Sequence, residues 1–310
     1  MTVHIDQAAI DRTIEEEIRP ALARIEASRK ASLLLVRMVA AGMFGGFGII
    51  ALILWGLITI WLAVGVLAVG AFATGAVVWA MVRLYRGVAR SVLVPPLAAA
   101  IGGMSYNRTA EGFNATGVLG LGLLPRADVV QAEDMLVGTH RGVGFRLVEM
   151  SCYRMAGSGR NRRRQRVWRG LVVEVDVPVP FRGPVLLVRD RRASSGPEGL
   201  RQVAFPHAGF SEIFAVHAAD PDEARRLITP ALADSLVALS RARPGRALGA
   251  AFAEGVFLLT VPLPRGFLEQ GSLFHPADRL IERVPAIVRE LTLPHRVIDY
   301  LVGDRPGPLL

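Results

Sequence analysis

Cysteine is almost absent from this chain, which has a single one, Cys152, among 310 residues. One cysteine excludes any intramolecular disulfide and any metal site built from several thiolates. The sequence also lacks the motifs GxSxG, HExxH, GxGxxG and Walker GKS/T, and its six histidines are scattered. Acidic pairs such as Glu133 with Asp134, or Glu149 with Asp176, would serve acid–base chemistry only if the fold brought them together. We therefore expect no catalytic residue, no metal site and no cofactor, and the sequence favours a protein that is not an enzyme.

Formal charge is absent from residues 38–82, which are rich in leucine, isoleucine, valine, alanine and glycine. As one helix this segment would measure about 67 Å at ~1.5 Å per residue, roughly twice the hydrocarbon thickness of a bilayer. Two helices near 38–55 and 60–82 fit better, with a tight turn at 56–59. The sequence thus predicts a two-helix transmembrane hairpin. The alternative is a pair of buried helices in a soluble core.

Basic residues flank this segment on both sides and are absent from the predicted turn. They are Arg29, Lys30 and Arg37 before it, and Arg83, Arg86 and Arg90 after it. The positive-inside rule then predicts that both chain ends lie in the cytoplasm. The chain divides into residues 1–37, an N-terminal amphipathic helix, 38–82, the transmembrane hairpin, and 83–310, a cytoplasmic domain that carries the whole net charge of +9.

The N-terminal segment 6–32 carries one apolar stripe at helical spacing. The stripe consists of Ile10, Ile14, Ile18, Leu22 and Ile25. Because Pro20 has no backbone donor, we expect a kink or a helix boundary at Arg19. The stripe could pack within the protein, pair with a second copy or lie on the membrane, and the balanced charge of the polar face favours the first.

Beyond residue 104 the hydrophobic pattern alternates as in strands. Strands are predicted at 134–139, 143–153, 167–177, 184–190, 200–205 and 210–218, and a later hairpin at 247–253 and 256–263. Asp220, Pro221 and Glu223 form a helix-capping signal, and further helices are predicted at 230–241 and 276–301. Strands followed by helix, hairpin and helix indicate an α+β cytoplasmic domain with a mixed, mostly antiparallel sheet.

Arginines concentrate in residues 154–169, where no acidic residue occurs. The seven are Arg154, Arg160, Arg162, Arg163, Arg164, Arg166 and Arg169. Glycines and serine in the centre predict a mobile loop between two strands. Next to anionic lipid each cation would contribute about 1 kcal/mol, so the candidate lipid or polyanion contacts are Arg160, Arg162, Arg163, Arg164 and Arg166. Nucleic acid is disfavoured because no aromatic residue lies among the loop arginines before Trp168, and a solvated loop without a dedicated partner is the other alternative.

Small residues form candidate packing faces on the two apolar helices. Gly42 and Gly46 make a GxxxG motif in the first, and Ala71 and Gly75 give the second a similar face. Such faces let helix backbones approach closely. We predict that they pack within the hairpin, with a homodimer as the alternative.

Three segments of the domain can be compared with a known family. They are FSEIFAVH from Phe210 with DPDEARRLITPAL from Asp220, VWRGLVVEVD from Val167, and GLLP from Gly122 leading to Glu133, Asp134 and Gly138. Together with the paired apolar helices, they resemble an uncharacterised bacterial membrane family, domain of unknown function 3137. The resemblance covers nearly the whole chain and implies a location in the bacterial inner membrane. That family has no assigned catalytic residues, so it implies no site.

These observations predict a membrane-anchored binding or scaffolding module whose partners are the lipid bilayer and a protein or a second copy of the chain. Two alternatives stay open. One is an enzyme that acts on a membrane-associated substrate, and the other is a sensor of anionic lipid headgroups that uses the arginine-rich segment.

Overall fold

The computed structural model describes residues 7–57, 60–157, 162–177, 180–189, 199–242, 248–264, 266–267, 277–303 and 309. The chain divides into two compact units. The helical unit contains Asp11–Pro96 and Glu269–Val284, and the sheet unit contains Met1–Ile10, Leu97–Leu268 and Pro285–Leu310. The predicted boundary between residues 37 and 38 falls inside one continuous helix.

Two long helices make up most of the helical unit. After α1 (Gln7–Thr13) comes a single π turn, η1 (Ile14–Ile18), which leads into α2 (Arg19–Leu57). In the π turn the Arg19 N–H donates to the carbonyl of Ile14, five residues back. Pro20 cannot donate, and its ring would crowd the carbonyl four residues back in a regular helix. The irregularity expected at Arg19 therefore takes the form of a widened turn just before the proline.

The apolar stripe of the N-terminal segment is largely buried. Ile18 and Leu22 are fully buried, Ile25 nearly so, and Ile14 partly. In the same unit α2 packs against the 3-10 helix η3 (Ala277–Arg283), whose Leu280 is also buried. This burial matches the preferred prediction that the stripe packs within the protein.

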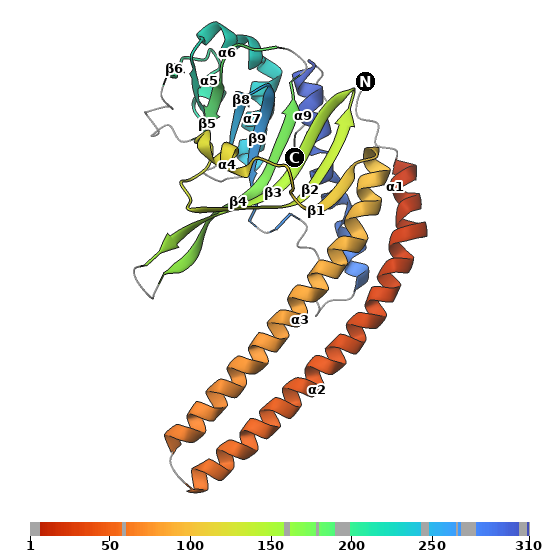
Figure 1. The fold of residues 1–310 in the computed structure, drawn as a ribbon. Helices are drawn as coiled ribbons and strands as arrows, with labels where there is room; N and C mark the ends of the chain where they lie inside the picture. Colours follow the sequence, from red (N-terminus) through yellow and green to blue (C-terminus); the bar gives the residue numbers. More distant parts are fainter. Residues whose placement is uncertain are drawn as a thin grey trace. The chain divides into compact units, whose positions relative to one another are not determined.

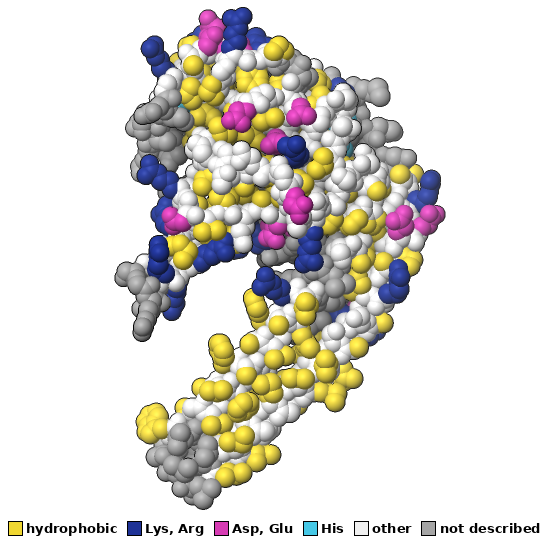
Figure 2. All heavy atoms as spheres, in the orientation of Figure 1, with side chains coloured by type: hydrophobic (Ala, Val, Ile, Leu, Met, Phe, Trp, Pro, Cys, Tyr) yellow, Lys and Arg dark blue, Asp and Glu magenta, His cyan; other side chains and the backbone are white. Residues whose placement is uncertain are grey.

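The apolar parts of α2 and α3 (Ile60–Gly102) lie side by side in antiparallel directions (Figure 1). Helix α2 ends at Leu57 and α3 begins at Ile60, and residues 58–59 of the predicted turn lie outside the described residues. Large apolar side chains cover the surface of both helices (Figure 2). The segments Ala8–Ile53 and Val64–Leu84 are long and apolar enough to cross a membrane, and only 6% and 11% of their most apolar windows are buried.

Within the described residues, nine strands form one sheet in the order β1-β2-β3-β4-β9-β8-β5-β7-β6. The strands are β1 (Ser105–Thr109), β2 (Val129–His140), β3 (Val143–Ala156), β4 (Arg163–Asp176), β5 (Val185–Val188), β6 (Arg201–Val203), β7 (Ala215–Ala218), β8 (Gly249–Ala253) and β9 (Val256–Pro262). Every one of these pairings is antiparallel. The predicted α+β class with a mostly antiparallel sheet is confirmed.

The two predicted tight hairpins are present. Arg141 and Gly142 join β2 to β3 with φ of 53° and 78°, and Glu254 and Gly255 join β8 to β9 with φ of 53° and 82°. Two successive residues with positive φ form the turn whose twist matches that of the strands, and glycine takes the second position without steric cost.

The strand predicted at 210–218 is wrong in its first half. Residues Ala208–Ser211 form the short helix α5, which begins where the Phe210 N–H donates to the ring of His207. Phe210 and Phe214 are both buried and stacked, with ring centroids 5.1 Å apart. Their spacing of four is helical, so the alternating pattern begins only at Ala215.

Helices cover both faces of the sheet. On one face α4 (Ala115–Gly120) packs over a core that includes Met150, Cys152 and Trp168. On the other, α9 (Leu293–Leu301) contacts β3 and β4 (Figure 1). The remaining helices of this unit are α6 (Pro221–Leu227), α7 (Pro230–Ala242) and α8 (Val284–Leu291).

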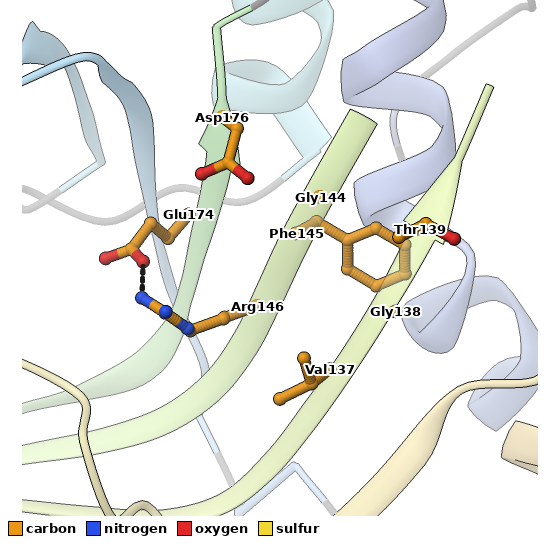
Figure 3. A pocket seen from close by; sticks show the side chains of 8 residues that line it. All are labelled: Val137, Gly138, Thr139, Gly144, Phe145, Arg146, Glu174 and Asp176. Carbon is orange, nitrogen blue, oxygen red and sulfur yellow. Dashed lines mark hydrogen bonds and ion pairs between the residues drawn. The ribbon is translucent and has the colours of Figure 1, made fainter. Parts of the chain in front are cut away.

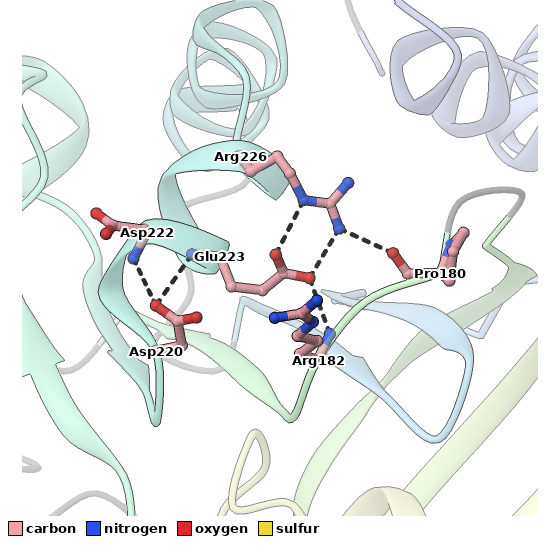
Figure 4. Close-up of polar contacts among 6 residues, drawn as sticks. All are labelled: Pro180, Arg182, Asp220, Asp222, Glu223 and Arg226. Atoms are coloured by element: carbon pink, nitrogen blue, oxygen red, sulfur yellow. Dashed lines mark hydrogen bonds and ion pairs between the residues drawn. The ribbon is translucent and has the colours of Figure 1, made fainter.

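Helix α6 begins at the predicted cap. Asp220 accepts from the N–H groups of Asp222 and Glu223, and Pro221 occupies the first helical position (Figure 4). Glu223 does not fold back on the cap as the sequence suggested. Its carboxylate accepts from the backbone N–H of Arg182 at 2.8 Å and from the guanidinium of Arg226. The hydrogen bonds from Arg226 and then from Arg182 lower the pKa of Glu223 to about 2 from an ordinary value of 4.5.

Substitution of Glu223 by glutamine should remove an acid-sensitive contribution to stability. Because the folded-state pKa is depressed, the carboxylate stabilises the fold above pH 4.5, and this contribution is lost as the pH falls toward 2. Solvent screens the half-exposed Arg226, so we expect a loss of about 1 kcal/mol at neutral pH. Urea unfolding of both chains at pH 7 and pH 3 measures it. If the unfolding free energies of the wild type and Glu223→Gln differ by the same amount at pH 7 and at pH 3, the low pKa does not belong to Glu223.

Candidate functional site

The far ends of β3 and β4 form a two-stranded projection from the sheet (Figure 1). Tyr153, Arg154, Met155 and Ala156 pair with Arg166, Gln165, Arg164 and Arg163 in turn. Strand β9 pairs with β4 only from Gly170 to Asp176, and β2 pairs with β3 only as far as Val129 opposite Tyr153. Beyond these residues the described parts of β3 and β4 pair only with each other. We call residues 153–156 and 162–166 the arginine arm.

The arm differs from the predicted loop. Arg163, Arg164 and Arg166 belong to β4, which begins four residues before the predicted start at 167. The side chains of Arg162, Arg163, Arg164 and Arg166 are exposed, whereas Arg160 lies outside the described residues. In Figure 2 basic side chains gather where the arm projects from the sheet unit. Most of the predicted loop is therefore strand, and its centre, residues 158–161, lies outside the described residues.

Two of the seven arginines are engaged elsewhere. Arg169 is largely buried, and its Nε donates to Glu149 Oε1 at 2.5 Å, while Glu149 Oε2 accepts from the Phe267 N–H at 3.1 Å. Arg154 donates to the backbone carbonyl of Arg126 at 3.1 Å. These contacts join the base of the arm to neighbouring parts of the sheet unit, so Arg154 and Arg169 have structural roles.

Further contacts hold the arm in register. Asp128, just before β2, donates its N–H to the Tyr153 carbonyl at 2.8 Å and accepts from the Met155 N–H at 2.7 Å. A bulge lies between Cys152 and Tyr153. The guanidinium carbon of Arg164 lies 3.9 Å from the centroid of the Tyr153 ring, which is a cation–π contact.

Cys152 lies at the base of the arm and is fully buried. Burial raises the pKa of its thiol to about 11. We expect the folded chain to react with a thiol reagent at pH 8 at least about a hundredfold more slowly than the unfolded chain, because both thiolate and access are lacking. Ellman's reagent with and without denaturant measures the ratio. Rapid reaction of the folded chain would show that this core is open.

A second polar cluster lies at the other end of the sheet, where α9 meets the β2–β3 turn. Asp299 is 1% exposed, and its Oδ1 lies 2.9 Å from His140 Nε2 and 3.0 Å from Arg141 Nε. The buried His295 ring is 4.6 Å from that of His140 and meets Phe145 edge-on. A β-carbon on Gly102, the last residue of α3, would approach the His295 ring to 3.3 Å. The cluster thus ties the end of α3, the sheet and α9 together within the sheet unit.

His295 makes this unit sensitive to mild acid. Burial, together with the charges of His140 and Arg296, lowers its pKa to about 4 from 6.5. Between pH 6.5 and pH 4, His295 is therefore protonated in the unfolded chain and neutral in the folded chain. The free energy of unfolding should fall by about 3 kcal/mol as the pH drops across this range. In urea unfolding at pH 7.5, 6 and 5, His295→Phe should flatten this slope and His207→Phe, on the surface, should not. Equal slopes for both variants would refute this origin.

A shallow hollow of about 190 Å³ lies on the sheet face opposite α9 (Figure 3). Arg146 and Glu174 form an ion pair beside it, and a β-carbon on Gly144 would collide with Asp176 Oδ2 at 2.3 Å. Asp176 and Glu149 lie apart, because Glu149 is opposite Leu171 on β4, five residues before Asp176. Glu149 is buried and paired with Arg169. Glu133 is exposed whereas Asp134, its neighbour in a β2 bulge, is buried and accepts from the Tyr106 hydroxyl. Neither acidic pair is assembled for acid–base chemistry.

No group of three or more histidine, cysteine, aspartate or glutamate side chains that could hold a metal ion is found in the part of the chain that the structure describes. The cluster around Asp299 could not be predicted from the sequence, because His140 and Asp299 are 159 residues apart.

The small residues of the apolar helices face outward. A β-carbon on Gly42, Gly46 or Gly75 would meet no atom within 4 Å, and Ala71 is exposed. The contact between α2 and α3 is made instead at Gly70, where a β-carbon would lie 2.7 Å from the Phe47 ring. The packing of Gly42, Gly46, Ala71 and Gly75 against another helix stays a prediction.

Comparison with known proteins places a domain of unknown function in this chain. Residues 166–302, from β4 through α9, match the model of a family described as "Protein of unknown function (DUF3137)". This match confirms the resemblance for residues 166–302, which include the segments from Val167, Phe210 and Asp220, whereas the segment from Gly122 and the apolar helices lie outside it. Residues 166–302 thus match a domain of unknown function, DUF3137.

Other comparisons are distant. The crystal structure of the mycobacterial trehalose monomycolate transport factor A, TtfA, aligns with 15% identity and a TM-score of 0.34, covering 68% of this chain and 95% of that chain. No curated protein matches the sequence.

Proposed function

We propose that this protein is a membrane-anchored binding module of the bacterial inner membrane. In this proposal α2 and α3 span the bilayer as a hairpin, and both chain ends and the DUF3137 domain lie in the cytoplasm. The observation that carries it is the apolar surface of the two helices. Leu52, Trp61 and Phe72 are each 79–80% exposed on helices without a formal charge between residues 37 and 83.

Exposure on this scale supports a membrane hairpin over helices of a soluble core. Core helices bury their apolar face, whereas the most apolar windows of these two are 6% and 11% buried. In water such a surface would drive aggregation, while in lipid it is the expected outer surface. The arginines at both outer ends and the uncharged turn support the cytoplasmic placement of the termini.

A role in binding, rather than in catalysis, is supported by how the described polar groups are used. Glu149, Glu223 and Asp299 are each held by an arginine or a backbone N–H in a structural contact. The arginine arm, in contrast, presents the exposed side chains of Arg162, Arg163, Arg164 and Arg166 as a charged surface. An enzymatic role would need a cleft where an acid, a base and a substrate meet, and no described cavity favours it.

Membrane fractionation of the full chain tests the anchor. We expect the chain to stay in the membrane pellet after alkaline carbonate extraction, with a reporter behind Leu310 active in the cytosol. The double variant Ile49→Arg/Phe72→Arg should reduce retention, because both exposed side chains lie near the middle of the uncharged parts of their helices. Each arginine at a helix centre costs about 2.5–3.5 kcal/mol for insertion. Val129→Arg, on an exposed position of the sheet unit, is the matched control. Recovery of the wild type in the supernatant would refute the proposal.

A further inference from the structure

We propose that the arginine arm binds anionic lipid headgroups of the membrane that holds the chain. This inference rests on the proposed anchor and names the ligand of the module. It begins from the arm's rigidity. Four consecutive antiparallel pairs build it, and Asp128 and the Glu149–Arg169 ion pair hold it at the base. Because the arm is preformed, binding does not have to order it.

The charge on the arm is uncompensated. Arg162, Arg163, Arg164 and Arg166 are exposed, and no ion pair with a carboxylate involves them among the residues that the structure describes. Alternate residues of a strand share a face, so Arg164 and Arg166 lie next to each other on one side of the arm. Neighbouring like charges on a sheet are unfavourable by themselves. A surface of phosphate groups removes that cost, and guanidinium groups bind phosphate with two parallel hydrogen bonds.

The aromatic residue of the arm favours lipid over nucleic acid. Tyr153 has Arg164 stacked on its ring at 3.9 Å, so that face is not available to a base. A partly apolar pair of this kind suits the headgroup region, where an aromatic body and a charged tip are both accommodated. Met155, which is paired with Arg164, adds apolar surface on the same face of the arm.

The covalent anchor strengthens such a contact. The sheet unit continues directly from α3, so the arm is tethered to the membrane at high effective concentration. Weak individual contacts of each arginine with phosphate then suffice for occupancy. The contact should weaken with salt, because it is electrostatic and made at an exposed surface.

Hydrogen exchange of the full-length chain in lipid nanodiscs tests the inference. One set of discs contains phosphatidylcholine only, and the other contains phosphatidylcholine with phosphatidylglycerol. We expect amides of residues 153–169 to exchange about tenfold more slowly in the anionic discs, and the difference to disappear at high salt. Arg162→Gln/Arg163→Gln/Arg166→Gln should abolish the difference. Arg108→Gln/Arg201→Gln/Arg241→Gln removes the same charge from exposed positions outside the arm and should preserve it.

Two results would overturn the inference. One is equal exchange of the arm in both kinds of disc, and the other is a difference that both triple variants lose equally. A third set of samples contains the phosphatidylcholine discs with a single-stranded oligonucleotide added. Stronger protection by the oligonucleotide than by anionic lipid would assign the arm to nucleic acid instead. Carbonate extraction of the same chains reports the anchor separately, so failure of the lipid contact and failure of the proposed anchor are distinguished.

Discussion

Replacement of Asp299 by alanine is expected to lower the free energy of unfolding of the sheet unit by about 3 kcal/mol. The carboxylate is 1% exposed and its Oδ1 contacts both His140 and Arg141. Its removal leaves these two groups without their acceptor and separates α9 from the β2–β3 turn. The value is at the low end for a buried pair, because the side chains of His140 and Arg141 are 21% and 30% exposed.

Asp234→Ala provides the matched control for this prediction. Asp234 also pairs with a histidine, His207, at 3.0 Å, but its side chain is 69% exposed. An exposed pair of this kind contributes less than about 1 kcal/mol. Denaturant titration of the full chain in detergent, followed by reaction of the buried Cys152 thiol, measures both variants. If Asp299→Ala lowers the free energy of unfolding no more than Asp234→Ala does, the Asp299 cluster does not hold α9 against the β2–β3 turn.

Substitution of Gly70 by leucine is expected to separate the two long helices. A β-carbon there would lie 2.7 Å from the Phe47 ring, and Thr74, one turn later, contacts Met43 on the same side. A leucine cannot fit without moving α2, and overpacking of this kind costs about 1–3 kcal/mol. Gly75→Leu is the control, because a β-carbon at Gly75 meets no atom within 4 Å.

Thiol cross-linking in the membrane measures this effect. Met43→Cys and Thr74→Cys, in a chain with Cys152→Ala, should cross-link efficiently with a short bifunctional thiol reagent, since the side chains at these two positions are in contact at 3.8 Å. Gly70→Leu should reduce the yield several-fold and Gly75→Leu should leave it unchanged. If both leucine variants behave alike, Gly70 is not the contact between α2 and α3. If Gly75→Leu alone disperses a dimer, the outward glycine face pairs with a second copy.

Local patterns predicted most of the secondary structure. The turns at 141–142 and 254–255 and the Asp220 cap all depend on residues close in sequence. Each is governed by short-range steric or hydrogen-bonding rules, and each is present in the structure. The prediction failed at Phe210, where a side chain of His207 starts a helical turn in a segment that reads as a strand.

The candidate site was predicted only in part. The cluster of arginines was evident from composition, but their division into exposed and structural groups was not. Arg169 is only three residues from Arg166, yet it is held by Glu149, which lies on the neighbouring strand. The strand pairing that turns residues 154–156 and 163–166 of the predicted loop into an arm depends on the register of β3 against β4, across a bulge.

By itself the sequence determined the apolar segment, the turn chemistry and the surplus of arginine, because these are properties of neighbouring residues. Tertiary structure alone decided which charges are buried and which face outward. His140 and Asp299 meet across 159 residues, and Glu149 reaches Phe267 across 118. Contacts at such separations depend on how strands and helices pack, and packing is set by many weak interactions that no short pattern contains.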